Sequence, residues 1–300
     1  NISSTRWIAD ATIRILQWHR PSLTLAYLPH LDYNLQRLGP DDPAIDGDLA
    51  EVDAEAGRVI DAAEDSGADV VVLSEYGITG VDRPVALNRV LREAGLLSVR
   101  REALGWETLD AGGSRAFAVA DHQVAHVYVH DPGDVPRVRA ILEAIDGVDR
   151  VLGRDEQVAA GLDHHRSGEL VVVASAGAWF TYYFWLDDQL APDYARTVDI
   201  HRKPGYDPVE LFVDPELRWP ALRVAGRLLK KKLGLRYYMD VIGLDASIVR
   251  GSHGRLPTPG REAEEGPVLI GSSTAVARDA VEMTEVKQLL LDLQFGSPGG

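Results

Sequence analysis

The chain has 300 residues, enough for one large α/β domain or two smaller ones with a sizeable buried core. Its formal net charge is −15, from 46 acidic and 31 basic residues, which argues against binding a nucleic-acid polymer, since that needs clustered cations. Because the chain has no cysteine, it has no disulfide or thiolate ligand, and a transition-metal site must use His, Asp and Glu. No apolar run reaches the roughly 20 residues of a membrane span, so we expect no membrane partner and favour the cytoplasm, although the compartment stays open.

The first part of the chain alternates between helical and strand-like patterns. Apolar residues at helical spacing predict helices over 3–16, 47–69 and 84–97, and the apolar runs "LTLAYLP" (23–29) and "DVVVLSE" (69–75) predict buried strands. Strand, helix and strand with continuous apolar runs are typical of a parallel sheet covered on both faces. We therefore predict an α/β fold with a mainly parallel sheet flanked by helices.

The pattern changes near residue 110. Strand-like alternation over 114–132, a helix over 134–145 and a strand over 169–176 predict a small α+β insertion. We expect three segments, listed here in chain order: the first part of the main α/β sheet (1–109), the insertion or subdomain (110–190) and a return to the main domain (191–300).

Polar side chains follow both predicted strands of the first segment. Asp32 comes after the first strand and Glu75 after the second, so both carboxylates are expected at the same edge of the sheet. His253 lies in the glycine-flanked loop "RGSHGRLP". Carboxylates and an imidazole that converge from separate strand ends suit a hard or borderline divalent cation. Taken singly, each residue is more often an ordinary turn residue.

Two further loops carry cations beside histidines. In "VDIHRKPGYDPVELF" (199–213), Arg202 or Lys203 could hold a phosphate while His201 reaches a metal, and the alternative is a salt-bridged structural loop. His165 and Arg166 in "DHHRSGEL" form a weaker candidate for contact with substrate.

The segment "VADHQVAHVYV" places His122 and His126 four residues apart, on one face of a predicted strand. Strand histidines that alternate with Val and Ala are more often packed than ligated. A bulge beside Asp121 would change that interpretation for His122.

The order of these segments resembles the alkaline phosphatase superfamily, in particular its nucleotide pyrophosphatase and phosphodiesterase branch. That branch usually reads Pro-Asp-x-x-Gly-His-x-x-Gly-Pro, then Ser-Asp-His-Gly-Met, then Gly-x-His-Gly. In "YLPHLDYNLQRLGP", "VVVLSEYGI" and "GSHG", Asp32 and Glu75 fall on the two aspartates and His253 on the last histidine. The resemblance implies an alkaline-phosphatase-like fold and a metal-dependent hydrolase of phosphoric esters. Asp32 and His253 would hold one of two divalent ions and Glu75 the other.

Two positions depart from the pattern of the resembled branch. Gln36 and Tyr76 stand where it has histidines, and an amide or phenol oxygen is a weaker zinc ligand than imidazole. If they are ligands, an oxygen-rich site would favour Mn²⁺ or Mg²⁺ over Zn²⁺. Alternatively, other histidines take their place, the candidates being His30, His122, His165 and His201.

The resemblance also implies a Thr or Ser nucleophile at a helix start, in a segment expected upstream of Asn1. We therefore expect the 300-residue chain to be a fragment that is inactive alone, to associate with that N-terminal segment, and to act on a phosphorylated small molecule. The alternatives are a member of the superfamily that has lost catalysis and binds a ligand or partner, and a metal-dependent phosphosugar mutase.

Overall fold

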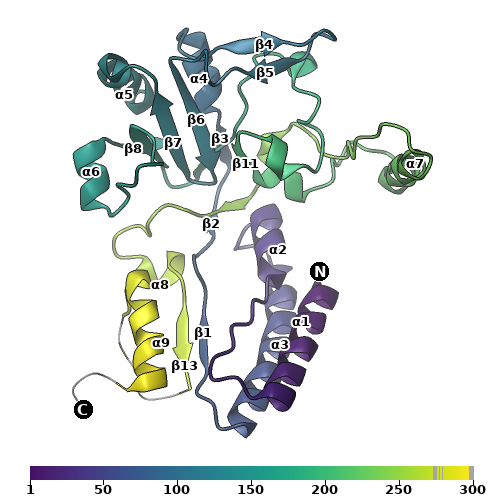
Figure 1. Ribbon diagram of the computed structural model, residues 1–300, viewed down its shortest axis with the longest axis vertical. Coiled ribbons are helices and arrows are strands. Elements are labelled where there is room, and N and C mark those ends of the chain that lie inside the picture. Colours follow the sequence, from purple (N-terminus) through teal and green to yellow (C-terminus); the bar gives the residue numbers. More distant parts are fainter. Residues whose placement is uncertain (273–275, 277, 279, 297–300) are drawn as a thin grey trace. The chain divides into compact units, whose positions relative to one another are not determined.

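The computed structural model describes residues 1–300 except 273–275, 277, 279 and 297–300 (Figure 1). The chain divides into two units, one formed by Asn1–Ile78 with Pro257–Gly300 and the other by Thr79–Leu256. The division into three segments made from the sequence stays a prediction.

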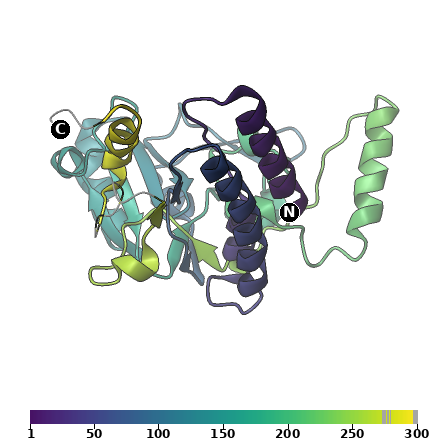
Figure 2. The same cartoon turned by 90° about the horizontal axis from the view of Figure 1, so that it is seen from below.

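Three helices form the N-terminal part of the first unit, namely α1 (Ile2–His19), α2 (His30–Leu38) and α3 (Ile45–Asp65). Two of them, α1 and α3, confirm predicted helices, and they lie side by side in Figures 1 and 2. The buried residues of α1 recur every three or four positions, which is the spacing of one helix face: Thr5, Ala9, Thr12 and Leu16.

The predicted strand over 23–29 does not form. These residues have no strand partner in the described part of the chain, and Leu25 is 80% exposed. Asp32 lies in α2, and no strand comes before it within the described residues. The next strand, β1 (Val71–Leu73), does form where it was predicted, and it pairs antiparallel with β13 (Leu269–Gly271). Helices α8 (Glu262–Glu265) and α9 (Val286–Phe295) complete this unit.

A five-stranded sheet in the order β11-β6-β7-β9-β8 organises the second unit. Its strands are β6 (Ala116–Asp121), β7 (Val124–Val129), β8 (Val148–Leu152), β9 (Leu170–Ala174) and β11 (Gly205–Tyr206). With α5 (Val135–Glu143) and α6 (Arg154–Ala159), they give residues 110–190 the predicted α+β character. Strand β9 is buried throughout and lies between β7 and β8.

Shorter pairs surround this sheet. They are β3 (Arg83–Val85) with β10 (Ala178–Phe180), β2 (Thr79–Gly80) with β12 (Gly251–Ser252), and β4 (Val99–Arg101) with β5 (Glu107–Leu109). The α/β class is confirmed, but the expectation of a mainly parallel sheet is wrong for the described strands. Among the pairs formed by the described strands, only β3–β10 and β6–β11 are parallel. Two-residue connections such as that between β6 and β7 can only join antiparallel strands.

Two helices of the second unit differ in how they are packed. Helix α4 (Leu87–Glu93), which confirms the helix predicted over 84–97, buries Leu87, Asn88 and Leu91, whereas α7 (Pro220–Lys232) has no buried residue. Figures 1 and 2 show α7 at the end of two connecting segments, away from the five-stranded sheet. Among the described residues, no helix is long and apolar enough to cross a membrane.

Candidate functional site

In the first unit, Asp32 is the centre of a polar contact between α2 and the segment that follows β1. Its Oδ1 atom accepts a hydrogen bond from Gln36 Nε2 at 2.9 Å, one helical turn further along α2. The same oxygen accepts a hydrogen bond from the Tyr76 hydroxyl at 3.2 Å. The two residues that replace the histidines of the resembled branch therefore both contact the carboxylate that is retained.

Burial and charge keep the Tyr76 phenol protonated. Desolvation, with a smaller contribution from the Asp32 carboxylate, raises the pKa of Tyr76 well above its usual value of 10.0. Burial likewise raises the pKa of Tyr27, and the charges of Asp32 and Glu75 add to the effect. Glu75 itself is exposed, two residues after β1 ends. The first unit thus brings two carboxylates into the same electrostatic environment.

In the second unit, His253 and His122 form a second polar cluster. The two rings lie 3.8 Å apart between centroids, and the Tyr206 ring stacks on His122 at 5.0 Å. Asp121 Oδ1 lies 2.7 Å from His122 Nδ1, a hydrogen bond that requires the tautomer with its hydrogen on Nδ1. A carboxylate that fixes the imidazole in this way is typical of histidines that bind metal ions.

The β6–β7 hairpin builds this cluster. His122 occupies its two-residue turn with φ 55, a left-handed conformation uncommon outside glycine. The loop that carries His253 is held against the turn by a hydrogen bond of 2.9 Å from Gln123 N to the His253 carbonyl. Tyr206 reaches the cluster because β11 pairs with the end of β6, in the register Tyr206 with Asp121.

His253 is neutral at physiological pH. Burial, together with the charge of His122, lowers its pKa from 6.5 to about 3. A neutral imidazole carries a ring nitrogen with a lone pair, which is the form that binds a cation. The donor set of the cluster, an imidazole pair with a carboxylate beside it, therefore fits a divalent metal ion.

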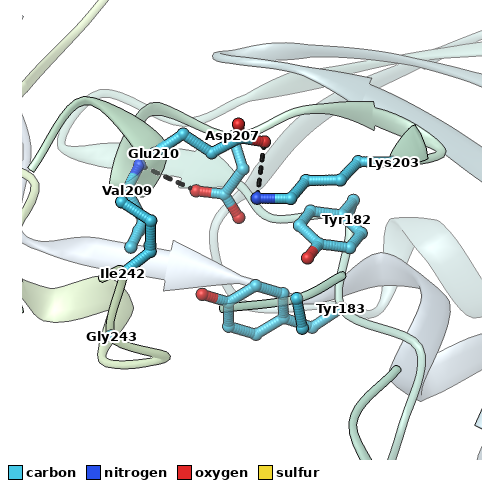
Figure 3. A pocket seen from close by; sticks show the side chains of 9 residues that line it. Tyr182, Tyr183, Lys203, Asp207, Val209, Glu210, Ile242 and Gly243 are labelled. Atoms are coloured by element: carbon cyan, nitrogen blue, oxygen red, sulfur yellow. Dashed lines mark hydrogen bonds and ion pairs between the residues drawn. The ribbon is translucent and has the colours of Figure 1, made fainter. Parts of the chain in front are cut away.

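The loop over 199–213 is tied together by its own charges (Figure 3). Lys203 Nζ is buried, lies 2.7 Å from Glu210 Oε1 and donates a hydrogen bond to the Thr197 carbonyl at 2.9 Å. Asp207 is buried beside this pair, and desolvation raises its pKa from 3.8 to about 7. These contacts fit the structural alternative for the middle of the loop. A role of Lys203 in binding phosphate stays a prediction.

The neighbours of Lys203 are more accessible. His201 and Arg202 are exposed, and the Arg202 guanidinium pairs with Asp193 at 3.1 Å. His165 and Arg166 are also exposed, in the turn that follows α6, where the His165 ring contacts His164 with 4.0 Å between centroids. Their proposed contacts with substrate stay predictions.

The sequence interpretation of the hairpin was partly wrong. His122 and His126 were expected on one strand face, but His122 lies in the turn and only His126 lies in β7. His126 is packed as predicted, with Nδ1 accepting a hydrogen bond from Gly168 N at 3.2 Å. Sequence reasoning missed Tyr206 as a neighbour of His122. The signal for the turn was "DHQ" between two alternating apolar runs.

Asp32 and Glu75 belong to the first unit and His253 to the second. Their convergence on one pair of metal ions stays a prediction. Within the described residues, each unit contributes its own cluster of carboxylate, hydroxyl and nitrogen donors. Such donors can bind hard or borderline divalent ions.

Comparisons with known proteins identify the class of protein that carries these clusters. A family model described as type I phosphodiesterase / nucleotide pyrophosphatase matches residues 1–207. An uncharacterized pyrophosphatase/phosphodiesterase of Schizosaccharomyces pombe is 33% identical over 88 residues, which are 26% of this chain and 17% of that protein.

Two solved structures are also similar. Phosphonoacetate hydrolase of Sinorhizobium meliloti, in complex with phosphonoformate, is 21% identical with a TM-score of 0.45, over 61% of this chain and 44% of that chain. Human ectonucleotide pyrophosphatase / phosphodiesterase 5 is 15% identical with a TM-score of 0.45, over 81% and 65%. The chain thus spans less than two thirds of the length of each of these relatives.

The matching family is described as one of phosphodiesterases and nucleotide pyrophosphatases, which are phosphoric ester hydrolases. The chain belongs to the type I phosphodiesterase / nucleotide pyrophosphatase family, which confirms the predicted resemblance to this branch of the alkaline phosphatase superfamily.

Proposed function

We propose that the whole protein is a metal-dependent hydrolase that splits a phosphodiester or phosphomonoester bond in a small molecule. The observation that carries this proposal is the family match over residues 1–207. Asp32 and Glu75 lie within this range, and the motif resemblance assigns them to the two aspartates of the branch. The net charge of −15 means that a phosphorylated substrate needs local cations, and divalent ions supply them.

The proposed metal ligands are Asp32 and His253 for one ion and Glu75 for the other. The neutral state of His253 and the carboxylates of Asp32 and Glu75 support this assignment, because all three offer lone pairs at pH 7. Such ions would lower the pKa of a nucleophile and stabilise the leaving oxygen. The exposed Arg202 would contact the substrate phosphate with its guanidinium, beside His201.

The nucleophile is proposed to lie outside residues 1–300, because no α-helix that follows a strand in the described part of the chain has Ser or Thr in its first turn. We therefore expect residues 1–300 alone to give no turnover of a nitrophenyl phosphodiester. Robust metal-dependent turnover by these residues would place the nucleophile within them.

One observation favours a second candidate, a family member that binds a ligand without catalysis. Gln36 and Tyr76 both donate hydrogen bonds to Asp32 Oδ1, so they occupy an oxygen that a metal ion would otherwise use. Metal content separates the two candidates. A catalytic protein should hold close to two divalent ions, whereas one that only binds a ligand needs none.

Replacing Glu75 tests the proposed hydrolase directly. In the whole protein, Glu75→Ala should abolish metal-dependent hydrolysis of bis(p-nitrophenyl) phosphate, with a thermal midpoint close to that of the wild type. Glu75 is exposed, and surface substitutions usually change stability by less than about 0.5 kcal/mol. Glu64→Ala is the matched control because it removes another exposed glutamate of the same unit, and it should keep full activity. Equal activity in both variants would contradict the role of Glu75.

A further inference from the structure

A second group of potential ligands lies between α2 and α3, and neither the family pattern nor the proposed function uses it. His30 opens α2, and Asp48 and Glu51 lie one turn apart on α3. One ligand atom of each residue lies within 4.8 Å of those of the other two. His30 is only 6% exposed, so its ring is removed from water at a point where two carboxylates meet.

The distances in this group suit a bound ion. His30 Nε2 lies 3.4 Å from Asp48 Oδ1 and 3.2 Å from Glu51 Oε2. Neighbouring ligand atoms around a tetrahedral ion with bonds of about 2.0 to 2.1 Å are about 3.3 Å apart. Despite these short distances, neither ring nitrogen of His30 makes a hydrogen bond within the described residues. A buried imidazole without a hydrogen bond costs free energy, and a cation between the three side chains would remove that cost.

The surrounding residues orient the ligands and leave the group accessible to an ion from solvent. Asn34 Nδ2 donates a hydrogen bond of 2.6 Å to Asp48 Oδ2, which leaves Oδ1 directed to His30. Contacts of this kind orient the ligands of a metal ion. The Glu51 side chain is 45% exposed, so an ion and a water ligand can reach the group from that side.

This group is separate from the contact of Asp32 with Tyr76. His30 and Asp32 are two positions apart on α2, so their side chains point about 200° apart around the helix axis. Asp32 contacts Gln36 and Tyr76, whereas His30 faces α3.

We propose that His30, Asp48 and Glu51 form a binding site for a single divalent cation, preferentially Zn²⁺, that fastens α2 to α3. One imidazole and two carboxylates, each at a near-tetrahedral separation from that imidazole, leave a fourth position for water, and Zn²⁺ accepts such a donor set. Because α2 also carries Asp32, the ion would hold the helix that presents this residue.

Calorimetric titration of Zn²⁺ into the metal-stripped whole protein tests the site. The background is the triple variant Asp32→Asn/Glu75→Gln/His253→Ala, which removes ligands of both proposed catalytic ions, so the result does not depend on the proposed function. This background should still bind Zn²⁺ at the α2–α3 site. Adding Glu51→Gln or His30→Gln should weaken that binding at least tenfold.

Asp53→Asn is the matched control, since it also removes one exposed acidic charge from α3, two positions from Glu51. It should bind Zn²⁺ as the background does, and Zn²⁺ should raise its thermal midpoint, an effect that the Glu51→Gln protein should largely lose. Because nearly half of the Glu51 side chain is exposed, its replacement should leave the fold intact. Zn²⁺ affinity that is the same in Asp53→Asn, Glu51→Gln and His30→Gln would overturn the proposal, as would a background that binds no Zn²⁺. Either outcome would make the group an ordinary ion pair.

Discussion

Asp32 Oδ1 shows how single substitutions change the chemistry of a site. Gln36 directs its amide nitrogen at this oxygen, so it acts as a hydrogen-bond donor toward Asp32 where a histidine could offer a lone pair. Tyr76 also donates to it, and the raised pKa of its phenol keeps that hydrogen in place at neutral pH. A cation at Asp32 must therefore compete with two donors or use Oδ2. An oxygen-rich site of this kind should prefer Mn²⁺ or Mg²⁺ to Zn²⁺.

Restoring an imidazole should reverse that preference. Tyr76→His removes the phenol donor and supplies a nitrogen ligand, so the affinity ratio of Zn²⁺ to Mn²⁺ should rise about tenfold or more in calorimetric titrations of the whole protein. Tyr33→His, at an exposed tyrosine of α2, is the control and should leave the ratio unchanged. These titrations belong in the Glu51→Gln background, so that Zn²⁺ at the α2–α3 group does not mask the effect. An unchanged ratio in Tyr76→His would mean that Tyr76 lies outside the metal site.

The buried carboxyl group of Asp207 should make the stability of the fold depend on pH. Its carboxyl is buried and its pKa is raised to about 7, so between pH 4 and pH 7 the folded protein holds a proton that the unfolded chain has lost. This group therefore lowers stability progressively as the pH rises through that range. Asp207→Asn removes the effect, and Asn can still accept the hydrogen bond from Val209 N. The unfolding free energy of the variant relative to the wild type should increase with pH, by up to about 1.4 kcal/mol per unit, and level off above pH 7.

Asp245→Asn provides the comparison in urea denaturation at several pH values from 4.5 to 8. Asp245 accepts a similar hydrogen bond, from Ser247 N, but its pKa is lowered by its hydrogen bonds to Ser247. Its titration falls below this range in both states, so the difference between Asp245→Asn and the wild type should be flat. A flat difference for Asp207→Asn as well would show that Asp207 is ionised in the folded protein.

At the scale of elements, helices were predictable where one apolar stripe recurs at helical spacing, as in α1 and α3. Strand pairing was not predictable, because an apolar run such as that of β1 does not indicate whether its partner strand is parallel or antiparallel. The residues 23–29 look like a strand locally, yet a strand also needs a partner, which depends on distant parts of the chain. For the same reason, the contact between Tyr206 and His122 required the pairing of β11 with β6.

The β11–β6 pairing depends on Gly205. This residue has φ 124, and a Cβ atom added to it would lie 2.6 Å from the Ala120 carbonyl oxygen. Gly205→Ala should therefore destabilise the protein by about 1 to 3 kcal/mol and displace Tyr206 from His122. Denaturant unfolding measures the first effect, and the NMR shifts of the His122 ring, which lose the ring-current contribution of Tyr206, report the second.

Gly226→Ala serves as the control for this substitution. Gly226 lies inside α7 with nothing within 4 Å of an added Cβ, so alanine there should be neutral or stabilise the protein by up to about 1 kcal/mol. If Gly205→Ala were as stable as Gly226→Ala, β11 would not need a glycine to approach β6.

At the scale of the whole molecule, the family was predictable from the order of three short motifs along the chain. The match over residues 1–207, which covers the first two of these motifs, confirms the family. The metal site was less predictable. Two of its expected histidines are replaced, and its predicted ligands belong to two units of the chain. The charge of −15 adds a requirement, since an anionic substrate approaches such a protein only where cations offset the overall field. The proposed hydrolysis therefore depends above all on bound metal ions.

The most direct test is the hydrolysis of bis(p-nitrophenyl) phosphate by the whole protein, first stripped of metal with a chelator and then supplied with Mn²⁺, Mg²⁺ or Zn²⁺. We expect no turnover by the stripped protein, and turnover restored by added metal, with Mn²⁺ or Mg²⁺ more effective than Zn²⁺. Full activity in the stripped protein would contradict metal dependence, and the absence of hydrolysis with every metal would contradict the proposed hydrolase.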